Sequence, residues 1–130
     1  MSHNNNQVKE KILNFASALN LGKFEDVLSF YSGEAIFMPD ENKTLKKSQI
    51  GKSGLEFLIE SDFKIRFDDV KIAIDEKYAF VEAIANTSQN DKESSSKLEK
   101  TSRDFFVFRK EEGDWKILRY IFNNVNASKL

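Results

Sequence analysis

The sequence predicts an α+β fold, in which a strongly bent, mainly antiparallel sheet wraps around about three N-terminal helices to form a cone. Residues 103–124 contain two long apolar runs joined by the polar turn EEGD, which is typical of an antiparallel hairpin. The first third of the chain instead spaces its apolar residues as helices do. Between these regions, two alternating segments differ in parity, which indicates a bend in the sheet.

Three helices are expected in the N-terminal half. The first covers residues 7–20, where the apolar residues form one stripe and Gly22 supplies the stop. A second, shorter helix follows over residues 24–31, with four apolar residues on one face that end at Tyr31. The third is expected to begin at Ser53, because Ser53-x-x-Glu56 matches a capping box and an apolar run follows it.

Strands account for most of the remaining chain. Residues 34–38 form a strand that stops at Pro39, and a short edge strand is expected around Leu45. Residues 63–67 and 70–74 both alternate, but on opposite parities, so we predict a β-bulge or sharp bend at Asp68-Asp69. After a strand over residues 78–87, residues 86–100 carry one apolar residue and three consecutive serines, and a flexible connection is expected there.

Length and composition favour one domain over residues 7–126, preceded by a flexible leader over residues 1–6. The net charge is −1 and no face is obviously basic, so nucleic acid is not an expected partner. No apolar run approaches the ~20 residues of a membrane helix, and the polar start lacks a signal-peptide core. We therefore expect a cytoplasmic protein that does not bind membranes.

The residue types available for chemistry are restricted. Cysteine is absent, and the only histidine, His3, lies in the expected leader. This removes thiol chemistry, the usual general base near neutral pH and the commonest metal ligand. We expect no metal site and no cofactor, so any acid–base work would fall to aspartate, glutamate, tyrosine or lysine.

The order of elements resembles that of the nuclear transport factor 2-like superfamily, which includes ketosteroid isomerases and SnoaL-like polyketide cyclases. The resemblance implies a cystatin-like cone with a pocket, and it spans nearly the whole chain. This scaffold hosts enzymes, binders and assembly domains, so the resemblance is informative about the fold but not about the function. The segments that carry it are FASALNLGKFEDVLSFYSGEAIFMPD, QIGKSGLEFL and VFRKEEGDWKILRYIFNN.

The catalytic residues of the isomerases do not carry over. The family's helix tyrosine, which donates to the developing oxyanion, falls on Phe15. The family's aspartate base falls on Pro39, one residue before Asp40. The second, protonated aspartate falls near Phe106, and Asp104 lies two residues away on the same face of that strand. An oxyanion hole needs its donors within reach of one point, so the resemblance argues against steroid isomerisation by that mechanism.

Three carboxylates are candidates for catalysis. Glu82 lies among apolar neighbours in YAFVEAIA, where a desolvated carboxylate could act as an acid or base, but it could equally sit on the solvated sheet face beside Arg103 or Arg119. Asp40 is either a base at the pocket mouth or a turn residue after a proline. Asp104 is either a pocket base or one partner of a cross-strand ion pair.

The strand register implied by the resemblance assigns eight residues to the pocket. The hydroxyls of the two tyrosines in this set would orient a ligand, or would instead reach backbone or water from a packed core. On this register Trp115 and Ile117 fall on the outer face, which predicts a homodimer through that face. The expected ligand-binding residues are Phe15, Tyr31, Phe80, Glu82, Phe106, Leu118, Tyr120 and Phe122.

Three functions remain open at this point. The first is the binding of a small apolar molecule in an aromatic-lined pocket. The second is a cyclase- or isomerase-type enzyme, in which a pocket carboxylate removes a proton next to a carbonyl and a tyrosine stabilises the enolate. The third is a dimerisation or assembly module that uses the outer face and holds no ligand.

Overall fold

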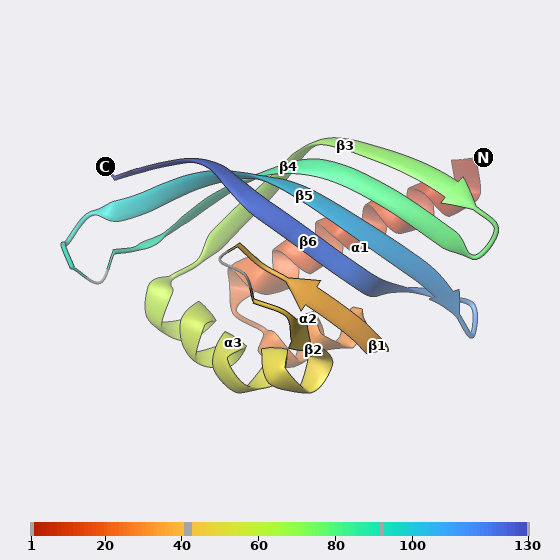
Figure 1. The fold of residues 1–130 in the computed structure, drawn as a ribbon, viewed down its shortest axis with the longest axis horizontal. Helices are drawn as coiled ribbons and strands as arrows, with labels where there is room; N and C mark the ends of the chain where they lie inside the picture. Colours follow the sequence, from red (N-terminus) through yellow and green to blue (C-terminus); the bar gives the residue numbers. More distant parts are fainter. Residues whose placement is uncertain (1, 41–42, 92, 130) are drawn as a thin grey trace.

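The computed structural model describes residues 2–40, 43–91 and 93–129. Over these residues the chain forms three helices and six strands, and the bent sheet arches over the helices, as expected (Figure 1). None of the helices is both long and apolar enough to cross a membrane. The elements are α1 (Ser2–Leu21), α2 (Phe24–Ser29), β1 (Tyr31–Met38), β2 (Leu45–Lys46), α3 (Lys47–Ser61), β3 (Lys64–Asp75), β4 (Tyr78–Asn90), β5 (Lys97–Glu111) and β6 (Asp114–Lys129).

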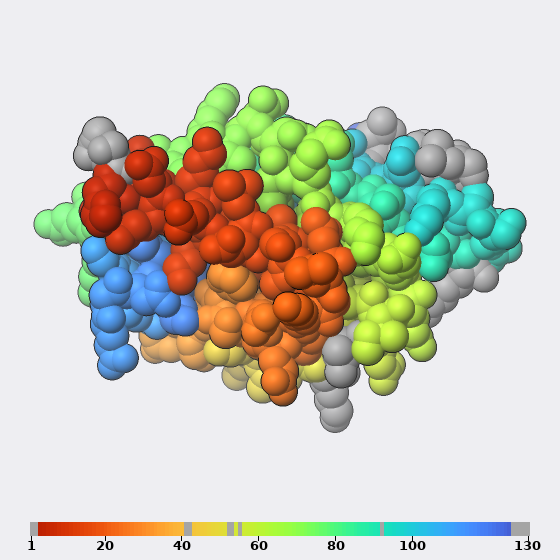
Figure 2. All heavy atoms as spheres, turned by 180° about the vertical axis from the view of Figure 1, so that it is seen from behind, coloured from red at the N-terminus to blue at the C-terminus, as the bar shows by residue number. Residues whose placement is uncertain are grey.

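The strands form one sheet with the order β2-β1-β6-β5-β4-β3. Only the pairing of β1 with β6 is parallel, and the other neighbours pair antiparallel. The helices lie on the concave face, and helix α1 crosses it along most of its length (Figure 1). Seen from behind, α1 and α2 cover the middle of this face, while the β4–β5 hairpin extends beyond them (Figure 2).

The predicted β-bulge in β3 is confirmed. Asp68 pairs with Ile84 but Lys71 pairs with Glu82, so the bulge gives β3 one residue more than β4. Asp69 takes a positive φ of 52°, a conformation that aspartate tolerates better than most residues. The bulge turns the apolar residues on both sides of it toward the same core. These are Ile65 and Phe67 before the bulge, and Val70, Ile72 and Ile74 after it.

A second bulge, in β6, was not predicted and corrects two assignments. Val107 pairs with Arg119 but Phe108 pairs with Ile117, which leaves Leu118 as the extra residue. The strand therefore changes faces at Leu118. Trp115 and Ile117 are buried in the core, and their expected place on the outer face is wrong. Leu118 lies at the bulge rather than in the row of inward side chains.

The register of β4 is one residue from the expected one. Its concave face carries a row of small buried residues, and the bulkier alternate set points outward. Phe80, which is 38% exposed, and Glu82 both lie on the convex face, so their assignment to the pocket is wrong. Both sets are largely apolar, so hydrophobicity alone could not choose between them. The concave row consists of Ala79, Val81, Ala83 and Ala85.

Three further expectations need correction. Helix α1 begins at Ser2 rather than at residue 7, and within it His3 faces Gln7 one turn away. Helix α3 begins at Lys47, six residues before the expected start at Ser53. Residues 86–100 are mostly strand, because β4 continues to Asn90 and β5 begins at Lys97. Polar side chains suit these strand ends because they extend beyond the helices.

The end of helix α1 fixes the helix against the sheet. Gly22, with a φ of 67°, closes the helix through hydrogen bonds from the Gly22 and Lys23 amides to the carbonyls of Leu19 and Ala18. Just before this stop, the Asn20 side chain binds the backbone of Ile65 in β3. Its Nδ2 donates to the Ile65 carbonyl at 3.0 Å, and its Oδ1 accepts from the Ile65 amide at 2.6 Å.

We expect Asn20→Ala to lower the free energy of unfolding by about 1–3 kcal/mol, because both Ile65 backbone groups would lose their partner in a half-buried place. The measurement is urea denaturation followed by circular dichroism. Asn14→Ala is the matched control, since Asn14 is exposed on the same helix, and its effect should stay within about 0.5 kcal/mol. Equal effects of the two substitutions would contradict this role for Asn20.

Candidate functional site

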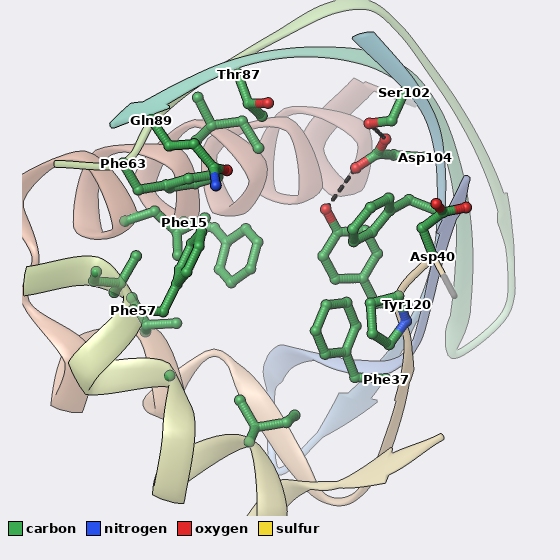
Figure 3. A pocket seen from close by; sticks show the side chains of 18 of the residues that line it. Phe15, Phe37, Asp40, Phe57, Phe63, Thr87, Gln89, Ser102, Asp104 and Tyr120 are labelled. Atoms are coloured by element: carbon green, nitrogen blue, oxygen red, sulfur yellow. Dashed lines mark hydrogen bonds between the residues drawn. The ribbon is translucent and has the colours of Figure 1, made fainter. Parts of the chain in front are cut away.

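A cavity of about 380 Å³ lies between the helices and the concave face of the sheet (Figure 3). This volume falls in the lower part of the range of small-molecule sites, roughly 300–1,000 Å³. Its walls are mainly apolar and come from all three helices as well as β1, β3 and β6. The apolar lining consists of Phe15, Leu19, Phe24, Val27, Phe37, Pro39, Ile50, Phe57, Leu58, Phe63, Ile65 and Phe122.

Aromatic rings form the floor of the cavity around Phe15. Its ring meets those of Tyr31 and Tyr120 edge-on, with centroids 5.8 and 6.1 Å apart. Tyr120 is stacked between Phe106, at 4.1 Å, and Phe37, at 5.0 Å. Each such pair contributes about 0.5–1.5 kcal/mol beyond the burial of area. The stacking therefore fixes the Tyr120 ring, and its hydroxyl is held in one place.

A buried carboxylate, Asp104, lies at the centre of the polar part of the cavity. It is only 4% exposed. Tyr120 donates its hydroxyl proton to Oδ2 at 2.5 Å, and Ser102 donates to Oδ1 at 2.5 Å (Figure 3). Alternation along β5 places Ser102 and Asp104 on the concave face together with Phe106. Asp104 thus forms a short polar network in an otherwise apolar floor.

Burial controls the ionisation of this cluster. Desolvation raises the pKa of Asp104, and the hydrogen bonds from Ser102 and Tyr120 only partly offset the rise. Burial also raises the pKa of Tyr120 well above its usual value, and the charge of Asp104 adds to that shift. Asp104 is therefore a stronger base than an exposed aspartate, while Tyr120 stays a neutral donor.

Tyr31 is the second hydroxyl of the cavity. Its side chain is 4% exposed and lines the cavity, and burial raises its pKa. Tyr31 lies near enough to Tyr120 to contribute to the raised pKa of that residue. Within the described part of the chain its hydroxyl makes no hydrogen bond, although its backbone carbonyl accepts one from Lys47. The hydroxyl is therefore available to a molecule in the cavity.

The mouth of the cavity is polar. Asp40 accepts hydrogen bonds from the backbone amide and the side chain of Asn124, at 3.4 and 3.1 Å, which ties the end of β1 to β6. Two lysines also line the cavity, Lys43 after β1 and Lys100 on β5. Thr87 and Gln89 continue the concave face of β4 beyond the alanines (Figure 3). Asp40 is thus both a turn residue and a lining residue.

The structure brings together part of the predicted site. Phe15, Tyr31, Tyr120 and Phe122 line the cavity, and so do the candidate carboxylates Asp40 and Asp104. Four other assignments are corrected. Phe106 is fully buried behind Tyr120, Leu118 lies at the bulge, and Phe80 and Glu82 point to the convex face. The ion pair considered for Asp104 is also wrong, because Arg103 is exposed on the opposite face.

Sequence reasoning missed most of the apolar lining, of which it named only Phe15 and Phe122, and it also missed polar residues. Ser102 and Lys100 continue the alternation of Phe106 and Asp104 along β5, so the signal was present. It was overlooked because residues 86–100 were interpreted as a loop and the next strand was expected only from residue 103. In the described residues no group of three histidine, cysteine, aspartate or glutamate side chains is arranged to hold a metal ion. The missed polar lining residues are Lys43, Thr87, Gln89, Lys100, Ser102 and Asn124.

Solved structures with the same architecture include proteins of several kinds. A type 2 hexachlorocyclohexane dehydrochlorinase superposes with a TM-score of 0.88 at 8% identity, covering 98% of this chain and 88% of its own. A ketosteroid isomerase-like protein from Erwinia carotovora atroseptica gives 0.81 at 15% identity, covering 97% and 99%. An NTF2-like protein with a cystatin-like fold from Novosphingobium aromaticivorans gives 0.78 at 10% identity, covering 94% and 82%.

At these identities the likeness shows the fold alone. No curated protein matches the sequence. A family model does match: that of the SnoaL-like domain, over residues 8–122, which reach from within α1 to within β6. The predicted resemblance to SnoaL-like proteins is thereby confirmed: the chain belongs to the SnoaL-like domain family, and its fold is that of solved NTF2-like and ketosteroid isomerase-like structures.

Proposed function

We propose that this protein binds a small, mostly apolar molecule in its cavity. The observation that carries the proposal is a mainly apolar cavity of about 380 Å³ with a hydrogen-bonded group of Ser102, Asp104 and Tyr120 on its floor. Small-molecule sites have this character, because the apolar walls supply affinity and a few placed polar groups fix orientation. In this protein Tyr31, Tyr120 and Asp104 would orient one polar group of the ligand. The absence of cysteine favours the cytoplasm as its location.

A substitution that places a bulky side chain at the mouth of the cavity should weaken the binding of a ligand. We expect one equivalent of the neutral dye phenylnaphthylamine to bind the unaltered protein with a rise in fluorescence. Thr87→Trp should lower this affinity at least about tenfold, because the indole would project into the cavity from β4. Ser88→Trp is the matched control, since Ser88 points to the other face, and it should bind normally. Failure of the unaltered protein to bind any such dye would contradict the proposal.

A catalytic role is the second candidate, and it rests on the contact between Asp104 and Tyr120. A buried carboxylate with a raised pKa can remove a proton from a carbon next to a carbonyl. The C–H electron pair would pass into the enolate, and the proton would move to Asp104. The free hydroxyl of Tyr31 would donate to the developing oxyanion, since the proton of Tyr120 is already engaged by Asp104. Glu82, which is exposed on the convex face, has no part in this scheme.

For this enzyme we expect deuterium from heavy water to enter the carbon next to the carbonyl of an apolar ketone such as tetralone, measured by NMR. Asp104→Asn should lower the exchange rate by about a hundredfold or more. Asp40→Asn, the matched control at the mouth, should change it little. The rate should rise with pH as Asp104 loses its proton, with a midpoint above the ordinary pKa of an aspartate.

The outcomes separate the two roles. Dye binding without exchange would leave the binding function alone. Deuterium exchange that persists in Asp104→Asn would remove Asp104 from the mechanism. Loss of the exchange in Asp40→Asn would instead identify Asp40, at the mouth, as the base.

We also propose a homodimer through the convex face of the sheet, formed by other residues than those expected from the sequence. Phe80, Phe105 and Ile121 are 38–41% exposed there. Phe105 pairs directly with Ile121, and Phe80 with Val107, so the apolar side chains are contiguous. Such a patch is larger than scattered surface residues produce and is typical of an interface. Trp115 and Ile117, on which the dimer was first expected, are buried and take no part.

We expect native mass spectrometry to show a dimer, and Phe105→Glu to raise its dissociation constant at least about tenfold by placing a charge in the apolar patch. Leu13→Glu is the matched control, because Leu13 is equally apolar and is 52% exposed on helix α1. A monomer in the unaltered protein, or equal dissociation in both variants, would contradict the proposed interface.

A further inference from the structure

The two carboxylates that line the cavity have hydrogen-bond donors, whereas the two lysines that line it have no ion-pair partner among the described residues. Asp104, on the floor, accepts hydrogen bonds from two hydroxyls, and Asp40, at the mouth, accepts two from Asn124. Lys43 and Lys100 form no ion pair with any described carboxylate. The mouth of the cavity therefore carries two lysine side chains whose positive charges are not balanced by any described carboxylate.

Two other lysines near the cavity do have a carboxylate partner. Lys64 and Lys97 both reach Asp62, at 3.3 and 3.0 Å. Lys97 lies on the same strand as Lys100, three residues earlier, so partners are available in the region. Lys100 differs because it lines the cavity, and no described carboxylate pairs with it.

The regular geometry of β5 sets the distance between Lys100, at the mouth, and Asp104, on the floor. The pairing of β4 with β5 continues without a shift from Tyr78 opposite Arg109 to Asn90 opposite Lys97. Lys100, Ser102 and Asp104 therefore share one face of β5. At about 3.3 Å per residue, the backbone of Lys100 lies about 13 Å from that of Asp104. The cavity also has apolar walls from α1, α3 and β3, which include Leu19, Phe57 and Ile65.

We propose that the ligand is an amphipathic organic anion, with its apolar body in the cavity and its carboxylate or similar anionic group at the mouth beside Lys100 and Lys43. This inference rests on the proposed binding function and specifies its ligand class. The end that reaches the floor would carry a hydrogen-bonding group for Tyr31 and the Asp104–Tyr120 pair. A molecule with an anion at one end and a carbonyl or hydroxyl about 10 Å away meets both requirements.

Two dyes with the same aromatic skeleton test the proposal. Anilinonaphthalene sulfonate carries an anionic group, and phenylnaphthylamine is its uncharged parent. We expect the unaltered protein to bind the sulfonate more tightly than the parent. Lys100→Gln and Lys43→Gln should each lower the affinity for the sulfonate about threefold to fivefold and leave that for the parent unchanged. Added salt should also weaken binding of the sulfonate alone.

The controls separate the possible failures. Lys71→Gln removes the same charge from the convex face and should change neither affinity. Thr87→Trp should lower the affinity for both dyes at least about tenfold; a sulfonate whose affinity this variant leaves unchanged sits elsewhere, and the inference is then wrong. Equal affinities for the two dyes, or no effect of either cavity lysine, would also overturn it while leaving the proposed binding function intact. If neither dye binds, the binding function itself fails.

Discussion

The alternation of side chains along each strand constrains this fold most strongly. A strand can change the face it buries only by gaining a residue, and extra residues at Asp69 in β3 and at Leu118 in β6 do this here. Each bulge also bends its strand, and together they curl the sheet over helix α1 (Figure 1). Because the sheet curves over the helices rather than lying flat on them, the core leaves a cavity between the two layers.

Asp104 shows how this hollow tolerates a carboxylate. Burying a charge is costly, and the two hydroxyl donors offset only part of that cost, so its proton is held more tightly than usual. The rings of Phe106 and Phe37 hold Tyr120 in the position that makes the contact with Asp104. A polar group at the floor is therefore fixed before any ligand enters, and a ligand would not bear the cost of ordering it.

Much of the fold could be predicted from the sequence because its signals are local. The periodicity of α1, the stop at Gly22, the change of parity at Asp68-Asp69 and the EEGD turn each have a direct physical reason. The site was harder to predict, because one step of register exchanges the faces of β4, and both of its faces are apolar. Glu82 was misplaced for this reason. The bulge at Leu118 could not be recognised in the sequence, because β6 is apolar around it. Trp115 and Ile117 were therefore assigned to the wrong face.

The small residues on the concave face of β4 limit how such a pocket can diversify. Ala79, Ala83 and Ala85 are buried in the same core as the apolar stripe of α1, so a larger side chain in that row would displace the helix. Thr87 and Gln89 continue the row where the helices no longer cover it, and only there could side chains change in size without disturbing the core. Selectivity among molecules of different shape would thus be adjusted at the entrance, while the interior stays the same.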